Sequence, residues 1–185
     1  MKFEIYCVRI LVYVKMGKVE VNMEIRKTKK EDIKEVMALY KSAQQFMIEN
    51  GNPTQWGTEY PNDEIVLADI EEDISYVCVD EGKIVGVFYF RMGVDEAYTN
   101  IYDGEWLDDE EYGVVHRIAS GKKGVGGFCL DWCFEKHPNI KIDTHVDNIP
   151  MQKLLEKKGF TYCGKVIIEG YGERIAFQKN KEKSE

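Results

Sequence analysis

The chain has 185 residues, of which 44% are hydrophobic and 31% are charged. This composition excludes a disordered or collagen-like protein, and the length suffices for one domain with a full hydrophobic core. The formal net charge of -8 argues against nucleic acid or an anionic membrane as the partner and suits a cationic partner better.

The cysteines are scattered along the chain and form no CxxC pair: Cys7, Cys78, Cys129, Cys133 and Cys163. Their odd number and their spacing argue against a disulfide framework and against a zinc site, so we expect buried free thiols and no metal. The apolar stretch near the start is too short for a secretory signal or a membrane span. We therefore expect a cytoplasmic protein.

The first 22 residues have two interpretations. They are rich in β-forming residues and could add an extra strand. Alternatively, residues 17–22 are what a ribosome-binding site in frame with a start codon would encode, which makes Met23 the native start and residues 1–22 a non-native extension. We give this segment no function and expect one folded domain over 23–180, followed by a charged tail over 181–185.

The first predicted elements after the extension are a strand over 23–27 and a long helix. The sequence Thr28-Lys29-Lys30-Glu31 has the pattern of a capping box, in which Thr28 and Glu31 would cap the helix. Apolar residues at spacings of three and four continue the helix to a breaker cluster near residue 50. After a loop, a second and shorter helix is expected around residues 65–70.

The rest of the chain alternates strands with two further helices, which begin at Gly124 and Asn148. A long acidic connection over 93–112 separates two of the strands. The strands are expected over 75–79, 84–92, 113–120, 140–145, 160–169 and 173–179. This order predicts a mixed α/β sheet with helices packed on it.

The segment 115–127 runs from a strand through a glycine-rich turn into a helix. Gly124 and Gly126 have no Cβ atoms, so backbone N–H groups can approach a ligand closely. The first N–H groups of a helix have no internal partner and carry the positive end of its dipole. The turn therefore suits a phosphate or pyrophosphate, and Lys122 and Lys123 add positive charge.

Together with the later segment 147–160, this turn resembles the GNAT superfamily of N-acetyltransferases, and the resemblance covers about residues 23–179. Gly124 and Gly126 match the family's pyrophosphate loop. The later helix matches the family pattern at Asn148, Glu156, Lys157, Gly159 and Phe160. The resemblance implies an α/β fold with flanking helices, a mixed and mostly antiparallel central sheet, and two splayed strands, 114–120 and 140–145.

The resemblance also implies acetyl-CoA as the acetyl donor. Its pyrophosphate would lie on the backbone of Lys123, Gly124, Val125 and Gly126. Its pantetheine would pair with the main chain of Ile118 and Ser120 and contact the side chain of Asn148. The sequence departs from the family pattern at Gly121, where Gln or Arg is usual, so the hold on phosphate would shift to Lys122 or Lys123.

A second departure concerns the proton donor, because Leu155 replaces the tyrosine that most often acts as general acid in this family. Other candidates for proton transfer are Asp143, acting through a water, and two of the three histidines, His116 and His145. Tyr162 and Cys163 are further candidate acids. Each of these residues could instead be structural, as a salt-bridge partner, a strand residue or part of a helix cap.

Strand alternation adds a geometric expectation. It places Val114, His116 and Ile118 on one face of their strand and turns Arg117 to the other face. Only one of these faces can meet the substrate.

For the acceptor, Trp56 and Tyr60 lie between the first two helices, where the family builds its acceptor wall, and Trp106 lies in the acidic connection. Aromatic rings among carboxylates suit a cationic amine; the alternative is that they anchor loops. The sequence therefore predicts acetyl transfer from acetyl-CoA to a primary amine of a small molecule or peptide. The alternative is a module of the same fold that binds acyl-CoA without efficient catalysis. Edge strands could pair two copies in a homodimer.

Overall fold

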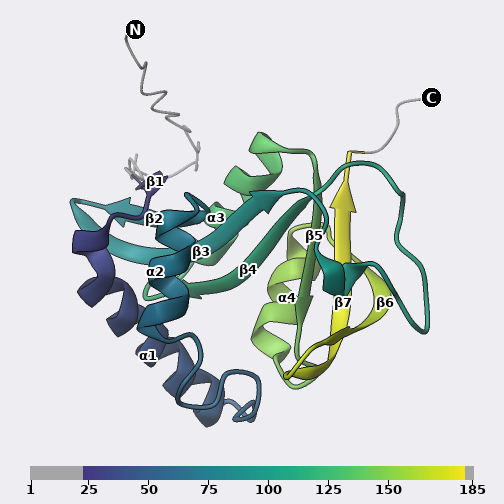
Figure 1. Ribbon diagram of the computed structural model, residues 1–185, viewed down its shortest axis with the longest axis horizontal. Helices are drawn as coiled ribbons and strands as arrows, with labels where there is room; N and C mark the ends of the chain where they lie inside the picture. The colour runs from purple at the N-terminus through teal and green to yellow at the C-terminus, as the bar shows by residue number, and fades with distance from the viewer. Residues whose placement is uncertain (1–22, 182–185) are drawn as a thin grey trace, which may run out of the picture.

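The computed structural model describes residues 23–181 (Figure 1). The proposed extension or extra strand at 1–22, and the charged tail beyond residue 181, lie outside the described residues. The strands are β1 Met23–Lys27, β2 Ser75–Asp80, β3 Lys83–Met92, β4 Gly113–Ser120, β5 Asn139–Thr144, β6 Thr161–Ile168 and β7 Gly172–Asn180. The helices are α1 Ile33–Glu49, α2 Asp63–Glu71, α3 Val125–Lys136 and α4 Ile149–Lys157, with short 3-10 turns η1 Lys30–Asp32 and η2 Glu96–Tyr98.

The strands form one sheet in the order β1-β2-β3-β4-β5-β7-β6. Neighbouring strands are antiparallel except β4 and β5, which are parallel. Helices α3 and α4 cover one face, where Val115 and Ile142 point into the core. Helices α1 and α2 and the connection between β3 and β4 cover the other face, where Val87 and Val114 are buried. The predicted mixed and mostly antiparallel sheet with flanking helices is confirmed.

The parallel strands β4 and β5 pair only at their first residues, Gly113 with Ile140 and Val114 with Lys141. At this end side chains pack directly over Gly113, because a Cβ there would lie 2.6 Å from the Phe90 ring and 2.9 Å from Ile140 Cδ1. Beyond these pairs the strands separate, as the gap below β4 in Figure 1 shows. The predicted splay of these two strands is confirmed.

Strand β4 contains a bulge opposite Phe88 of β3. Val87 pairs with Ala119 and Tyr89 pairs with His116, so Arg117 and Ile118 together lie opposite one residue. Arg117 adopts a left-handed backbone conformation with φ of 50°. A bulge inserts an extra residue and so breaks the alternation of faces along a strand.

The prediction that His116 and Ile118 share one face of β4, with Arg117 on the other, is therefore wrong. His116 and Arg117 lie on the same side, where both contact the Tyr89 ring. The centroids of the His116 and Tyr89 rings are 5.3 Å apart, and Cζ of Arg117 lies 4.8 Å from the Tyr89 centroid. Ile118 instead packs into the core beneath α3 and α4.

The start of the first helix also differs from the predicted capping box. The Thr28 hydroxyl lies 2.7 Å from the Ser75 hydroxyl on β2 and does not cap the helix. The Lys29 N–H donates instead to the Asp32 carboxylate at 2.8 Å, and Arg26 donates to both oxygens of Asp32 at 2.6 and 3.0 Å. The acidic cap is therefore Asp32 rather than Glu31.

The cysteines within 23–181 are buried free thiols, as predicted: Cys78, Cys129, Cys133 and Cys163. Burial raises the pKa of the Cys133 thiol well above its ordinary value. No cluster of ligating side chains that could hold a metal ion occurs among residues 23–181. In the same part of the chain, every helix is too short or too polar to cross a bilayer.

Candidate functional site

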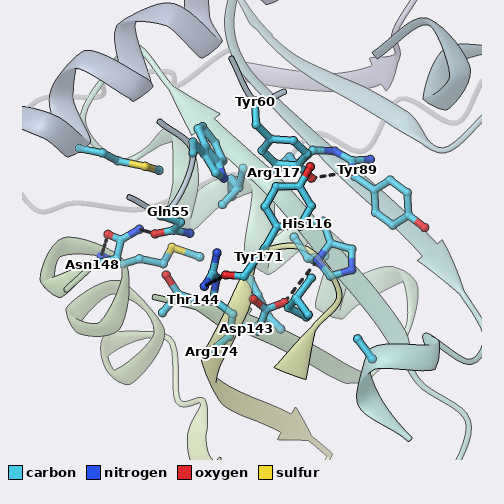
Figure 2. A pocket seen from close by; sticks show the side chains of 18 of the residues that line it. Gln55, Tyr60, Tyr89, His116, Arg117, Asp143, Thr144, Asn148, Tyr171 and Arg174 are labelled. Carbon is cyan, nitrogen blue, oxygen red and sulfur yellow. Dashed lines mark hydrogen bonds and ion pairs between the residues drawn. The ribbon is translucent and has the colours of Figure 1, made fainter. Parts of the chain in front are cut away.

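A cavity of about 310 Å³ lies where β4 and β5 separate (Figure 2). Its walls come from segments that are far apart in sequence: the loop between α1 and α2, the two separating strands, the start of α4 and the β6–β7 hairpin. Its polar and aromatic lining residues are Gln55, Trp56, Tyr60, Tyr89, Asp95, His116, Arg117, Asp143, Thr144, Asn148, Tyr171 and Arg174.

The cavity has a side on each face of the sheet, because it passes through the gap between the strands. Asp143 pairs with Ala176, and Arg174 is two residues before Ala176 on β7, so both charged side chains lie on the face of the β3–β4 connection. Thr144 is the next residue on β5 and lies on the opposite face, with Asn148 at the start of α4. One side is therefore rich in charge, and the other is lined mainly by hydroxyl, amide and apolar groups.

Four side chains on the charged side form two hydrogen-bonded pairs, which are joined by a close contact between His116 and Asp143. His116 Nε2 lies 2.8 Å from Asp95 Oδ2, and His116 Nδ1 lies 3.5 Å from Asp143 Oδ1. The Tyr98 hydroxyl donates to the same Asp143 oxygen at 2.7 Å. Burial would raise the pKa of Asp95, but the hydrogen bond and charge of His116 outweigh burial and lower this pKa below its ordinary value. Burial and the Asp143 carboxylate raise the pKa of Tyr98 well above its ordinary value.

This arrangement defines the chemistry available to His116. An ionised Asp95 can only accept a hydrogen bond, so Nε2 of the ring is the donor. In the neutral ring, the other nitrogen, Nδ1, then carries the lone pair. His116 lines the cavity, so this lone pair is placed to take a proton beside Asp143.

Arg117 is held in a polar network on the α2 side of the cavity. It donates to the Asp69 carboxylate at 2.6 Å and to the Tyr60 hydroxyl at 3.1 Å. Burial raises the pKa of Asp69, and the Arg117 guanidinium opposes this shift. The positive charge of Arg117 is therefore balanced within the protein.

Arg174 differs from Arg117 in its partners. The residue is only 6% exposed, and its Nη1 donates to the backbone carbonyls of Tyr171 at 2.7 Å and Glu173 at 2.9 Å. No carboxylate oxygen of residues 23–181 lies within 4.0 Å of the Arg174 guanidinium, so Arg174 forms no ion pair with these residues. Burial lowers the pKa of Arg174, and the more distant Asp143 charge opposes this shift.

Two tyrosines connect the two halves of the split sheet across the cavity. Tyr60 lies in the loop between α1 and α2, and Tyr171 is at the tip of the β6–β7 hairpin. Their ring centroids are 4.8 Å apart. Figure 2 shows the two rings next to each other. The contact limits the size of a ligand that can occupy the charged side.

On the other side, Asn148 begins α4 and faces the cavity. Its Oδ1 accepts the Met151 N–H at 3.2 Å, and its Nδ2 donates to Gln55 Oε1 at 2.9 Å. Thr144 is 1% exposed, and its hydroxyl has no hydrogen-bond partner in the part of the chain that the structure describes. A buried polar atom without a protein partner is expected to find one in a ligand or water.

The glycine-rich turn lies beyond the cavity, at the end of β4. Gly124 has a φ of 91° and is the residue before the first turn of α3, and a Cβ there would meet no atom within 4 Å. The side of Gly124 that a Cβ would occupy is therefore open. Lys122 forms an ion pair with Asp80, and the hydrogen bond with Asp80 raises the pKa of this lysine.

The predicted site residues fall into two groups. The cavity brings together Trp56, Tyr60, His116, Ile118, Asp143 and Asn148. The predicted phosphate-binding group lies outside the cavity lining, along the end of β4 and the start of α3: Ser120, Lys122, Lys123, Gly124, Val125 and Gly126. The roles of both groups stay predictions.

His145 and Trp106 are outside the cavity lining. His145 Nδ1 accepts the Asp147 N–H at 3.2 Å, in the turn before α4. Trp106 donates to the Tyr98 carbonyl at 3.0 Å. The buried Lys141 ammonium lies 4.3 Å from the Trp106 ring and 4.0 Å from the Tyr112 ring, so these rings already hold a cation of the chain itself.

Hydrogen bonds also fix the acidic connection to the sheet. Asp108 accepts hydrogen bonds from Asn139 at 2.8 Å, from Gln178 at 3.2 Å and from Asn180. The candidate acids Tyr162 and Cys163 lie on β6 outside the cavity lining, and Leu155 is fully buried in the core.

Sequence analysis did not find Asp95, Arg117 and Arg174 as site residues. The bulge in β4 reverses the expected direction of Arg117. Asp95 and Arg174 reach the cavity only through tertiary structure, because β7 pairs beside β5 and the connection folds over both. The one signal for Asp95 was its place in a long acidic loop.

Neither a scan against protein-family models nor a search of curated proteins gives a match. Among solved structures, a GNAT-family acetyltransferase from Streptococcus agalactiae 2603 is 35% identical with a TM-score of 0.80, covering 87% of this chain and 96% of that chain. A GNAT-family acetyltransferase from Listeria monocytogenes 4b F2365 is 16% identical with a TM-score of 0.64, covering 90% and 99%. The protein yncA from Salmonella typhimurium, solved with its cofactor acetyl-CoA, is 15% identical with a TM-score of 0.57, covering 88% and 96%. The last two similarities show a shared fold.

Proposed function

The chain belongs to the GNAT family of acetyltransferases, and we propose that it transfers the acetyl group of acetyl-CoA to a primary amine by direct attack on the thioester. The observation that carries this proposal is the gap between β4 and β5. It gives a donor and an acceptor separate sides of one cavity and lets them meet between the strands.

The donor is proposed to lie on the α4 side. The main chain of Ile118 and Ser120 borders the open edge of β4, where a pantetheine amide can pair with it. The unpartnered Thr144 hydroxyl and the Asn148 amide would supply further polar contacts. The pyrophosphate would bind the N–H groups at the start of α3, over Lys123 to Gly126.

The acceptor is proposed to lie on the charged side. An ammonium group would be attracted by Asp143 and would lose a proton to Nδ1 of His116, with Asp95 as the positioning residue that holds the ring. The neutral nitrogen then attacks the carbonyl carbon, so that a C–N bond forms and the C–S bond breaks. The nitrogen loses its second proton to solvent as the thiolate leaves, and His116 and the proton donor to the thiolate return to their starting states by exchange with solvent.

The thiolate needs a proton donor, because Leu155 cannot supply one. The phenols of Tyr60 and Tyr171 line the cavity and are the donors we propose in its place. The Tyr60 oxygen already accepts a hydrogen bond from Arg117, so its own proton is free for donation.

The test combines acetyl-CoA titration calorimetry with a thiol-release assay over a panel of amines and N-terminal peptides. Binding with thiol release from at least one amine supports the transferase. Binding without release from any amine would favour the module that binds acyl-CoA without catalysis, and absence of binding would contradict both.

A further inference from the structure

The charges that line the cavity are unevenly balanced. Arg117 is paired with Asp69, and Asp95 is paired with His116. Within residues 23–181, Arg174 is left without an ion pair, and Asp143, which contacts only Tyr98 and Nδ1 of His116, lies on the same side of the cavity without an ion pair to Arg174. Two separated charges of opposite sign are complementary to a ligand that carries both signs itself.

Arg174 is also built to bind an anion. Two backbone carbonyls of the β6–β7 hairpin fix its Nη1, so the planar guanidinium is held in place before any ligand arrives. Its other N–H groups have no partner within residues 23–181. A buried cation is costly unless it is paired, and a guanidinium matches a carboxylate in two parallel hydrogen bonds.

We propose that the acceptor is a small free amino acid, whose carboxylate binds Arg174 while its amine lies beside Asp143 and His116. This inference rests on the proposed acetyl transfer and narrows its acceptor. Arg174 is then the residue that determines specificity, and the hairpin that carries it is part of the acceptor site.

The dimensions of the site favour a free amino acid over the end of a peptide. A cavity of about 310 Å³ is at the lower limit of ligand sites, and the acetyl end of the donor must share it. The contact between Tyr60 and Tyr171 closes part of the charged side. A peptide also has a neutral amide where a free amino acid has its carboxylate, so it would leave Arg174 unpaired.

The experiment compares each amino acid with its own carboxamide in the thiol-release assay. The panel contains α-amino acids and the straight-chain series from β-alanine to 6-aminohexanoate, which varies the separation between amine and carboxylate. We expect at least one acid to exceed its carboxamide in kcat/KM by roughly 10- to 100-fold. The carboxamide of an α-amino acid has the less basic amine, so amine reactivity alone would give the opposite preference.

The matched variants are Arg174→Met, which removes the charge, and Arg174→Lys, which keeps it. We expect Arg174→Met to raise KM for the acid far more than KM for the carboxamide and so to abolish the preference, and Arg174→Lys to restore part of it. A purely structural role would lower the activity on both compounds together. Acetyl-CoA titration of each variant shows whether the donor site is intact.

The outcomes separate the two proposals. Equal use of acids and carboxamides by the wild-type protein would overturn the inference and leave acetyl transfer standing. A preference for acids that survives Arg174→Met would also overturn the role of Arg174. Acetyl-CoA binding without thiol release from any compound would contradict the proposed transfer itself, and with it the inference.

Discussion

The Tyr98 hydroxyl and the His116 imidazole approach the same oxygen, Oδ1 of Asp143, at 2.7 and 3.5 Å. Tyr98 and Asp95 both belong to the turn η2 and the residue before it. A short segment of the β3–β4 connection therefore positions both the ring of His116 and the carboxylate of Asp143. The connection contributes to the site through these two residues rather than through its many exposed acids.

Replacing His116 tests its role as the base. We expect His116→Gln to lower kcat by roughly 10²- to 10⁴-fold, because the amine loses its proton acceptor. The pH dependence of kcat should lose the limb that the base contributes. The matched control is His137→Gln, since His137 is half-buried and bonds the Glu111 carbonyl away from the cavity. An unaltered pH profile in His116→Gln would assign the proton transfer to another group.

Replacing Gly124 tests the predicted phosphate site. We expect Gly124→Glu to weaken acetyl-CoA binding by more than roughly 10-fold, because a carboxylate at the helix start repels the phosphates. No atom of residues 23–181 lies near the Cβ position, but the φ of 91° strains any side chain there, so circular dichroism and thermal unfolding check the fold of the variant before titration. Gly93→Glu is the control, because Gly93 also has a positive φ, of 108°, with no atom near its Cβ position, and it follows Met92, which pairs with Gly113 at the other end of β4. Titration calorimetry measures the acetyl-CoA affinity of both variants, and equal affinities would place the pyrophosphate elsewhere.

Replacing Leu155 tests whether the missing tyrosine limits the reaction. Leu155 is fully buried in the core under α3 and α4 and does not line the cavity. We therefore expect Leu155→Tyr to lower the free energy of unfolding by about 1–3 kcal/mol through overpacking, without a rise in kcat. Urea unfolding and the thiol-release assay give the two values. A higher kcat with unchanged stability would show that a phenol at this position reaches the thiolate.

The pair of Arg26 and Asp32 predicts a pH-dependent stability. The hydrogen bond from Arg26 lowers the pKa of Asp32 below its ordinary value. The ionised carboxylate therefore makes its full contribution to the free energy of unfolding above the ordinary pKa, and this contribution is lost as the pH falls through the lowered pKa. We expect Asp32→Asn to be less stable than the wild type at pH 7 and the difference to shrink below about pH 4.

The control for this prediction is Glu31→Gln, which changes the residue that the capping box had indicated. Its side chain is exposed, so we expect little change in the urea midpoint at either pH. A difference between wild type and Asp32→Asn that does not vary with pH would contradict the role of the carboxylate.

Much of the fold could be predicted from the sequence, because each helix and strand has its own apolar period and its own end signals. The long helix α1 and the strand β4 are found where the periodicity places them. The splay of β4 and β5 followed from the family resemblance, since no local pattern encodes the distance between two strands. The helix cap was misplaced because Thr28 bonds Ser75, a partner 47 residues away.

The site was harder to predict than the fold. A positive φ at an arginine has no sequence signature of the kind that glycine gives, so the bulge at Arg117 could not be foreseen. Arg174 reaches the cavity only because β7 inserts between β5 and β6. The rings of Trp106 and Tyr112 have the composition of a cation site, but the structure shows that Lys141 occupies it.

The gap between β4 and β5 has a kinetic consequence. A donor and an acceptor that approach from opposite faces of one sheet do not block each other, so both can be present before any bond changes. Initial-rate plots at several fixed concentrations of the second substrate should then intersect, as for a ternary complex, and should not run parallel, as for a covalent acetyl-enzyme. An inhibitor that joins coenzyme A to the acceptor would pass through the sheet itself, between the strands that separate after Val114.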